Sequence, residues 1–143
     1  MWLRIALDAD RLLDVFKGDV ATARWLGACE EVCVPRTVLR QLQSAFSKGA
    51  ERERNEALLQ RFLAKPNVRV LEPDQLTRWI FFALLHESRG AWRPWPEHAL
   101  WFAAFVMRHG LDPVSREIEV YASKGGGLYP DYLAARIENG AAS

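Results

Sequence analysis

The sequence predicts an α/β protein, a short parallel sheet of four to five strands wrapped by helices on both faces. Short apolar stretches alternate with longer stretches in which apolar residues recur at helical spacing. Enough chain separates successive strands for the helical crossovers that parallel strands require. The chain has 143 residues, of which 50% are hydrophobic and 26% charged, so it can bury a sizeable core. We expect one domain over residues 1–143.

Four stretches are candidate strands. Each is short, contains β-branched or other apolar residues, and is bounded by Gly, Pro or acidic residues. They cover residues 2–7, 31–34, 68–71 and 112–117. We expect the last of them to end at the carboxylate of Glu117.

The stretches between the strands are typical of helices, because their apolar residues recur every three or four positions. Asp19 is a candidate cap for the second helix, and Gly110 ends the sixth. Most tryptophans fall on apolar stripes and are expected in the core, namely Trp2, Trp25, Trp79 and Trp101. The first predicted helix follows Asp8 and ends at Gly18. The others cover residues 20–28, 36–48, 51–65, 74–89, 97–108 and 129–139.

Charge and cysteine content exclude several classes of protein. The formal net charge of +1 indicates no global attraction to nucleic acid, so such binding would need a local basic patch. Cys29 and Cys33 are too few for a disulfide framework or a zinc site, and we expect buried thiols in a reducing compartment. The first residues lack the features of a signal peptide, and no apolar run approaches the roughly 20 residues that a membrane helix needs. We expect a cytoplasmic protein.

The stretch of residues 5–14 (IALDADRLLD) is the first candidate functional site. A buried strand there ends in Asp8 and Asp10 and passes directly into a helix. Open α/β sheets place their chemistry at the carboxyl ends of parallel strands, so both carboxylates are candidate catalytic groups. Alternatively, either aspartate caps the following helix.

A second candidate site is the loop of residues 89–96 (RGAWRPWP), where two prolines exclude a regular helix or a central strand. Trp92 and Trp95 could stack on unpaired bases while Arg93 meets a phosphate. The same residues suit a protein interface. A third interpretation is that both tryptophans pack over the core.

Four stretches, in this order, resemble the motifs of PIN domains of the VapC-type toxin branch. Residues 7–14 (LDADRLLD) resemble the opening L-D-T-N motif, and residues 38–42 (VLRQL) resemble V-L-x-E-L. Residues 96–104 (PEHALWFAA) resemble P-x-N-D-L-W-I-A-A, and residues 110–117 (GLDPVSRE) resemble G-x-x-L-V-T-R-D. The resemblance spans residues 5–120, and the helix expected over residues 129–139 departs from the usual short ending of the family.

The resemblance implies a small metal-dependent ribonuclease, in which carboxylates at strand ends hold Mg²⁺ or Mn²⁺ against a scissile phosphate. Asp8 matches the first metal-binding carboxylate of the motifs and Glu117 the last. Gln41 stands where the family has Glu, and Ala99 stands where it has Asp. Asp10 takes the place of an Asn.

These departures predict a degraded metal site. Two divalent cations about 4 Å apart repel by about 4 kcal/mol even at the dielectric constant of water, and bridging negative charge must offset this repulsion. Gln41 brings an oxygen without charge and Ala99 brings neither. A single Mg²⁺ needs fewer carboxylates, and Asp8, Asp10 and Glu117 could still provide them.

Two functions follow. The first is a VapC-like protein with weak or no nuclease activity that acts by binding RNA or a protein. The alternative is an active Mg²⁺- or Mn²⁺-dependent endoribonuclease that uses Asp8, Asp10 and Glu117. The resemblance also implies a homodimer and a protein partner such as an antitoxin. As a lone imidazole near a helix start, His98 is expected to be a polar residue of the first turn and not a metal ligand.

Overall fold

The computed structural model describes residues 3–90 and 94–118. Its strands are β1 (Arg4–Leu7), β2 (Glu31–Pro35), β3 (Val68–Leu71) and β4 (Asp112–Val114). Its helices are α1 (Ala9–Phe16), α2 (Val20–Ala28), α3 (Arg36–Ser47), α4 (Arg52–Leu63), α5 (Gln75–Arg89) and α6 (Glu97–His109). Trp2, the glycine-rich turn at 124–127 and the helix expected over 129–139 lie outside the described residues.

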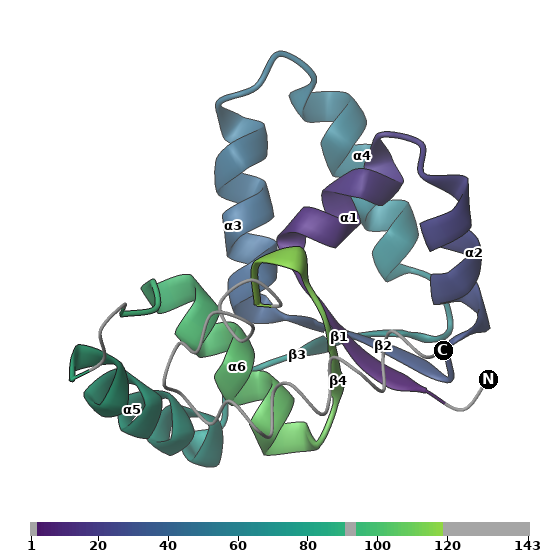
Figure 1. The fold of residues 1–143 in the computed structure, drawn as a ribbon. Coiled ribbons are helices and arrows are strands. Elements are labelled where there is room, and N and C mark those ends of the chain that lie inside the picture. The colour runs from purple at the N-terminus through teal and green to yellow at the C-terminus, as the bar shows by residue number, and fades with distance from the viewer. Residues whose placement is uncertain (1–2, 91–93, 119–143) are drawn as a thin grey trace.

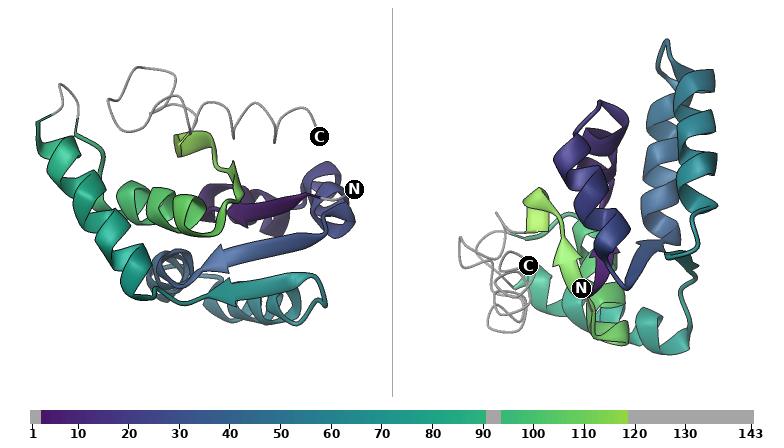
Figure 2. Two further views of the ribbon diagram at one scale, coloured as in Figure 1. Left: turned by 90° about the horizontal axis from the view of Figure 1, so that it is seen from below. Right: turned by 90° about the vertical axis from the view of Figure 1, so that its right-hand side faces the viewer.

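The strands form one parallel sheet in the order β3-β2-β1-β4. The left view of Figure 2 shows the arrowheads of β1, β2 and β3 pointing the same way. Helices α1 to α4 gather on one face, whereas α5 and α6 cover the other (Figure 1). The predicted α/β class and the helices on both faces are thus confirmed. The chain builds β1, β2 and β3 in one direction and then adds β4 on the opposite side of β1. This reversal creates a topological switch point between β1 and β4, where open α/β sheets form a crevice.

The core lies where the central strands meet the two helical layers. Three residues of β1, Ile5, Ala6 and Leu7, are fully buried, and β2 is buried over residues 32–35. Strands covered on both faces lose their alternation of polar and apolar residues, which explains the continuous apolar run of β1. Cys29 and Cys33 are buried free thiols, as expected. In the described part of the chain, no helix combines the length and the apolar character that crossing a membrane requires.

Several helix ends follow from single residues. Asp19 caps α2 by accepting a hydrogen bond from the backbone N–H of Thr22 at 3.0 Å, and Asp74 caps α5 by accepting from Thr77 at 2.8 Å. Gly110 ends α6 in the left-handed region with φ of 63°, a conformation that costs glycine little. The predicted cap at Asp19 and the predicted stop at Gly110 are confirmed.

The expectation that Trp79 is a core residue is wrong. The face of α5 that packs on α6 carries the buried residues, and there Phe81 stacks on Trp101 with ring centroids 3.9 Å apart. Trp79 lies on the opposite face with 62% of its surface exposed, beside Phe82 at 60% and Leu76 at 45%. Apolar residues occur all around this helix, and only one of its faces can pack against α6. The periodicity therefore could not identify the buried face.

The last predicted strand is also too long. β4 ends at Val114, and residues 116–118 form a helical turn. The hydroxyl of Ser115 accepts a hydrogen bond from the backbone N–H of Ile118 at 3.2 Å, which turns the chain away from the sheet. Glu117 consequently follows the strand in a helical turn and does not end it.

Candidate functional site

Asp8 is the central residue of the candidate site, because it lies at the carboxyl end of β1 and caps α1. Its Oδ1 accepts from the backbone N–H of Ala9 at 2.8 Å, and its Oδ2 accepts from the hydroxyl of Ser115 at 2.6 Å. The backbone N–H of Asp8 donates to the carbonyl of Val114 at 3.1 Å, which joins the ends of β1 and β4. The predicted capping role of Asp8 is confirmed, and its side chain lies at the switch point.

Asp8 is 3% exposed, and burial of its carboxyl raises the pKa to about 6. The hydrogen bonds from Ser115 and Ala9 lower the pKa and so oppose the shift, whereas the negative charges of Asp10 and Glu117 add to it. The folded state therefore disfavours the ionised form of Asp8. Ionisable groups with shifted pKa values are common at functional sites.

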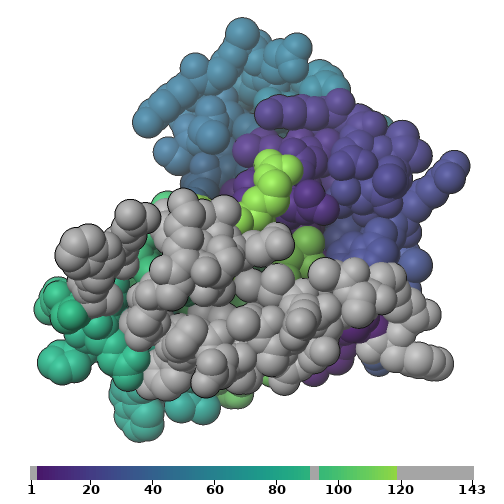
Figure 3. All heavy atoms as spheres, in the orientation of Figure 1, coloured from purple at the N-terminus to yellow at the C-terminus, as the bar shows by residue number. Residues whose placement is uncertain are grey.

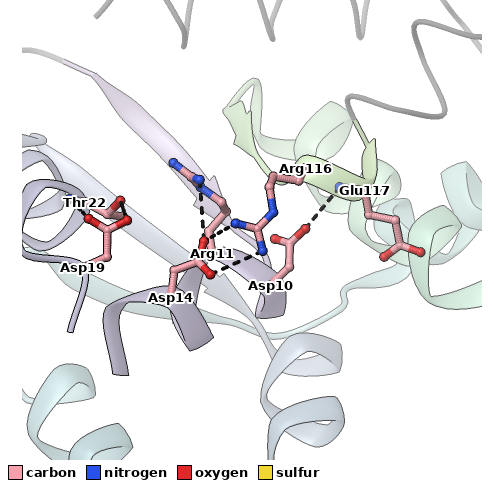
Figure 4. Close-up of polar contacts among 7 residues, drawn as sticks. All are labelled: Asp10, Arg11, Asp14, Asp19, Thr22, Arg116 and Glu117. Atoms are coloured by element: carbon pink, nitrogen blue, oxygen red, sulfur yellow. Dashed lines mark hydrogen bonds and ion pairs between the residues drawn. The ribbon is translucent and has the colours of Figure 1, made fainter. Parts of the chain in front are cut away.

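Asp10 and Glu117 lie next to each other although they are 107 positions apart in the sequence. The Oδ2 of Asp10 accepts from the backbone N–H of Glu117 at 3.1 Å, as Figure 4 shows. The Oδ1 of Asp10 is buried, and no described group hydrogen-bonds to it. Strand order explains this pairing, because α1 follows β1 directly and Glu117 follows β4, the neighbour of β1. The structure thus brings the three predicted carboxylates together at one edge of the sheet.

His98 holds the side chain of Glu117. Its Nε2 lies 2.7 Å from Glu117 Oε1 and 2.8 Å from Oε2, so both carboxylate oxygens face the imidazole. Both side chains are about one-third exposed, with values of 37% and 32%. His98 lies in the first turn of α6, as predicted, but its pairing with Glu117 was not predicted. The resemblance over residues 96–104 was the available signal, since that motif belongs to the same site as the motif that contains Glu117.

Two arginines and one carboxylate lie beside the three acids. Asp14 pairs with Arg11 one helical turn away, with Arg11 Nη1 3.6 Å from Asp14 Oδ2. Arg116 also binds Asp14, with one guanidinium nitrogen on Oδ2 and the other 3.3 Å from Oδ1. Figure 4 shows both guanidinium groups on Asp14, with Asp10 between them and Glu117. These arginines were not among the site residues predicted from the sequence.

The two substituted positions of the motifs contribute no charge to this edge. Gln41 is partly exposed on α3, which begins directly after β2, the strand beside β1. Ala99 is 1% exposed in the first turn of α6, one residue after His98. Within residues 3–90 and 94–118, no three His, Cys, Asp or Glu side chains are grouped so as to hold a metal ion. The described residues therefore do not fit a two-metal centre, which needs several bridging carboxylates.

The loop expected to bind a partner is described only in part, because Trp92 and Arg93 lie outside the described residues. Trp95 is 4% exposed, and its backbone N–H donates to the hydroxyl of Ser88 at 2.8 Å. The ring of Trp95 packs in the core, as the third interpretation predicted for both tryptophans, and nothing tests that interpretation for Trp92. A binding role for Trp92 and Arg93 stays a prediction.

Comparisons with known proteins place the fold. No protein-family model and no curated protein matches the sequence. Solved structures do match. A VapBC2 complex from Rickettsia felis, bound to a DNA fragment from its promoter, has a TM-score of 0.74 at 15% identity, over 88% of this chain and 96% of that chain.

Two further structures agree. DNA-bound VapBC from Salmonella typhimurium has a TM-score of 0.69 at 22% identity, over 82% of this chain and 91% of that chain. VapC20 from Mycobacterium tuberculosis, a toxin that cleaves the sarcin–ricin loop, has a TM-score of 0.61 at 15% identity, over 85% and 95%. This chain therefore has the PIN-domain fold of the VapC toxins, as its four sequence motifs predicted.

Proposed function

We propose that this chain is a VapC-like RNA-binding protein with weak or no nuclease activity. The pairing of both Glu117 oxygens with His98 is the observation that carries the proposal. The imidazole occupies the side of the carboxylate on which both oxygens face it, and so competes with a cation for that side. The last acid of the motifs is thus engaged by a protein group.

The charge at the strand ends supports the same conclusion. Asp8, Asp10 and Glu117 provide at most three negative charges. Gln41 and Ala99 add none. Two divalent cations are therefore weakly held here, whereas one cation with several bound waters needs fewer ligands.

RNA is the favoured partner, because VapC20, which shares the fold, cleaves an RNA loop. The polar groups of the site gather at the switch point between β1 and β4, where an RNA strand is proposed to bind. The fold neighbours include toxin–antitoxin complexes, and we accordingly expect an antitoxin-like protein partner for this chain as well. We also expect a single-domain homodimer in the cytoplasm.

The second candidate is an active Mg²⁺- or Mn²⁺-dependent endoribonuclease, and one observation favours it. Asp10 Oδ1 is buried without a hydrogen-bond partner among the described residues, which leaves a carboxylate oxygen available for a cation. Asp8, Asp10 and Glu117 would hold that ion only after their side chains moved, because no three such groups of the described residues are arranged to hold a metal. When bound, it would act as a Lewis acid that activates water and offsets phosphate charge. In that case Asp8 and Asp10 would orient the ion, and the ion would compete with His98 for Glu117.

Binding and cleavage of a labelled hairpin RNA separate the two candidates. We expect binding in EDTA, little or no cleavage in Mn²⁺, and no effect of Asp8→Asn on binding. Cleavage that requires Mn²⁺ and is lost in Asp8→Asn would establish the nuclease instead. If the protein binds no RNA in either buffer, the RNA-binding proposal is wrong.

A further inference from the structure

The surface beside the three acids carries the guanidinium groups of Arg11 and Arg116, which have no role in the proposed function. Arg11 extends from the first turn of α1, and Arg116 from the turn after β4. Their side chains are 31% and 55% exposed, whereas the carboxylate of Asp14 between them is 19% exposed. In the space-filling view the yellow-green end of β4 and its turn lies at the surface, against the purple atoms of α1 (Figure 3).

The charges of this group do not balance. One carboxylate faces two arginines, so Arg11, Asp14 and Arg116 counted by themselves carry one excess positive charge, and the negative charge of Asp10 also acts on Arg116. A carboxylate that accepts a bidentate arginine resembles in geometry the two oxygens of a phosphodiester, which arginine also binds in a bidentate manner. Of the two guanidinium groups, that of Arg116 lies on the side of Asp14 that faces Asp10 (Figure 4).

The neighbouring acids indicate a role for the two arginines. A phosphate that enters the switch point meets Asp10 and Glu117 and is repelled by both. Where few cations are held, protein groups must offset this repulsion, and Arg11 and Arg116 are the arginines that the structure places beside the acids.

We propose that Arg11 and Arg116 form a phosphate-binding site that holds an RNA strand beside Asp10 and Glu117. This inference rests on the proposed RNA binding. Asp14 is a positioning residue in this account, because it aligns the two guanidinium groups and also competes with the phosphate for them.

A second cluster of the same composition provides a matched control. Glu31 binds Arg4 at 3.0 Å and Arg69 at 3.1 Å, so one carboxylate again faces two arginines. Arg4 and Glu31 begin β1 and β2, so this cluster lies at the opposite edge of the sheet from Asp8. The arginines of this second cluster have the same charge as Arg11 and Arg116, but the acids of the candidate site do not lie beside them.

The test measures the affinity of a fluorescein-labelled single-stranded RNA of about 20 nucleotides by fluorescence anisotropy in EDTA at several salt concentrations. Each single-strand phosphate contact contributes about 0.7 to the slope of log affinity against log salt, or about tenfold in affinity near 50 mM salt. We expect Arg11→Gln and Arg116→Gln each to lose about this much. We expect the pair Arg4→Gln and Arg69→Gln to lose much less.

Asp14→Asn separates phosphate binding from a purely structural role. If the cluster only ties β4 to α1, Asp14→Asn and Arg116→Gln must change RNA affinity in the same direction. If the arginines bind phosphate, Asp14→Asn removes their competitor and raises the affinity, opposite to Arg116→Gln. Wild-type binding that is unchanged in both arginine variants overturns this inference but leaves RNA binding intact, whereas absence of wild-type binding overturns both.

Discussion

Replacement of Asp8 by Asn should stabilise the protein in the absence of metal ions. The Asp8 carboxyl is buried, and its pKa rises from 3.8 to about 6 on folding. A raised pKa means that the folded state disfavours the ionised carboxyl. The resulting cost is absent below the unfolded pKa of 3.8, develops as the pH rises towards 6, and is complete above it. The pKa difference corresponds to about 3 kcal/mol at neutral pH.

Asn keeps the geometry of this site while it removes the charge. An Asn carbonyl caps a helix about as well as Asp does, and its amide can donate to the hydroxyl of Ser115, which accepts as readily as it donates. We expect Asp8→Asn to gain about 1–3 kcal/mol at pH 7.5, which corresponds to about 3–10 °C in Tm for a chain of this length. Denaturation in urea and with heat, followed by circular dichroism in EDTA, measures both quantities.

Two comparisons make the result specific to Asp8. The gain should shrink as the pH falls from 7.5 through 6 and should vanish near pH 4, where both states of the wild type are protonated. Asp19→Asn is the matched control, because Asp19 also caps a helix but is exposed, and hydrogen bonds from Thr22 lower its pKa. Asp19→Asn should bring no gain. An Asp8→Asn protein no more stable than the wild type at pH 7.5 would refute the argument that burial makes this carboxylate costly.

Three other predictions follow from the fold. His98→Ala should strengthen Mn²⁺ binding several-fold in calorimetry, because it frees the glutamate carboxylate, and unchanged binding would show that the imidazole does not compete. Trp79→Ser combined with Phe82→Ser should shift a homodimer towards monomer in analytical ultracentrifugation, because these rings are 62% and 60% exposed on α5; an unchanged sedimentation coefficient would place the dimer surface elsewhere. Gly110→Ala should destabilise the protein by about 1 kcal/mol in urea, whereas Gly27→Ala, in an open position of α2, should not.

The order of strands and helices could be predicted because it depends on local patterns. Buried parallel strands are short apolar runs, helices have a period of 3.6 residues, and Asp19 is a local cap. Asp8 could be assigned to the site for a related reason, since a carboxylate directly after an apolar strand lies at the carboxyl end of the sheet wherever the strand is placed.

Other features depend on tertiary packing and could not be found in this way. The pairing of His98 with Glu117 joins α6 to the turn after β4, and it requires the strand order that places β4 beside β1. The exposure of Trp79 depends on which face of α5 meets α6. The clustering of Arg11 and Arg116 on Asp14 likewise requires the contact between α1 and the end of β4, which no local pattern specifies.

The most direct test of the central claim is isothermal titration of Mn²⁺ into the wild type, Asp8→Asn and the double variant Gln41→Glu with Ala99→Asp. A degraded metal site predicts weak or undetectable binding by the wild type and binding at least about tenfold tighter once the two carboxylates are introduced, which corresponds to about 1.4 kcal/mol. The Gln41→Glu variant alone serves as the second measurement if the buried Ala99→Asp change prevents folding. Tight wild-type binding that Asp8→Asn abolishes would contradict the account and establish a working metal site.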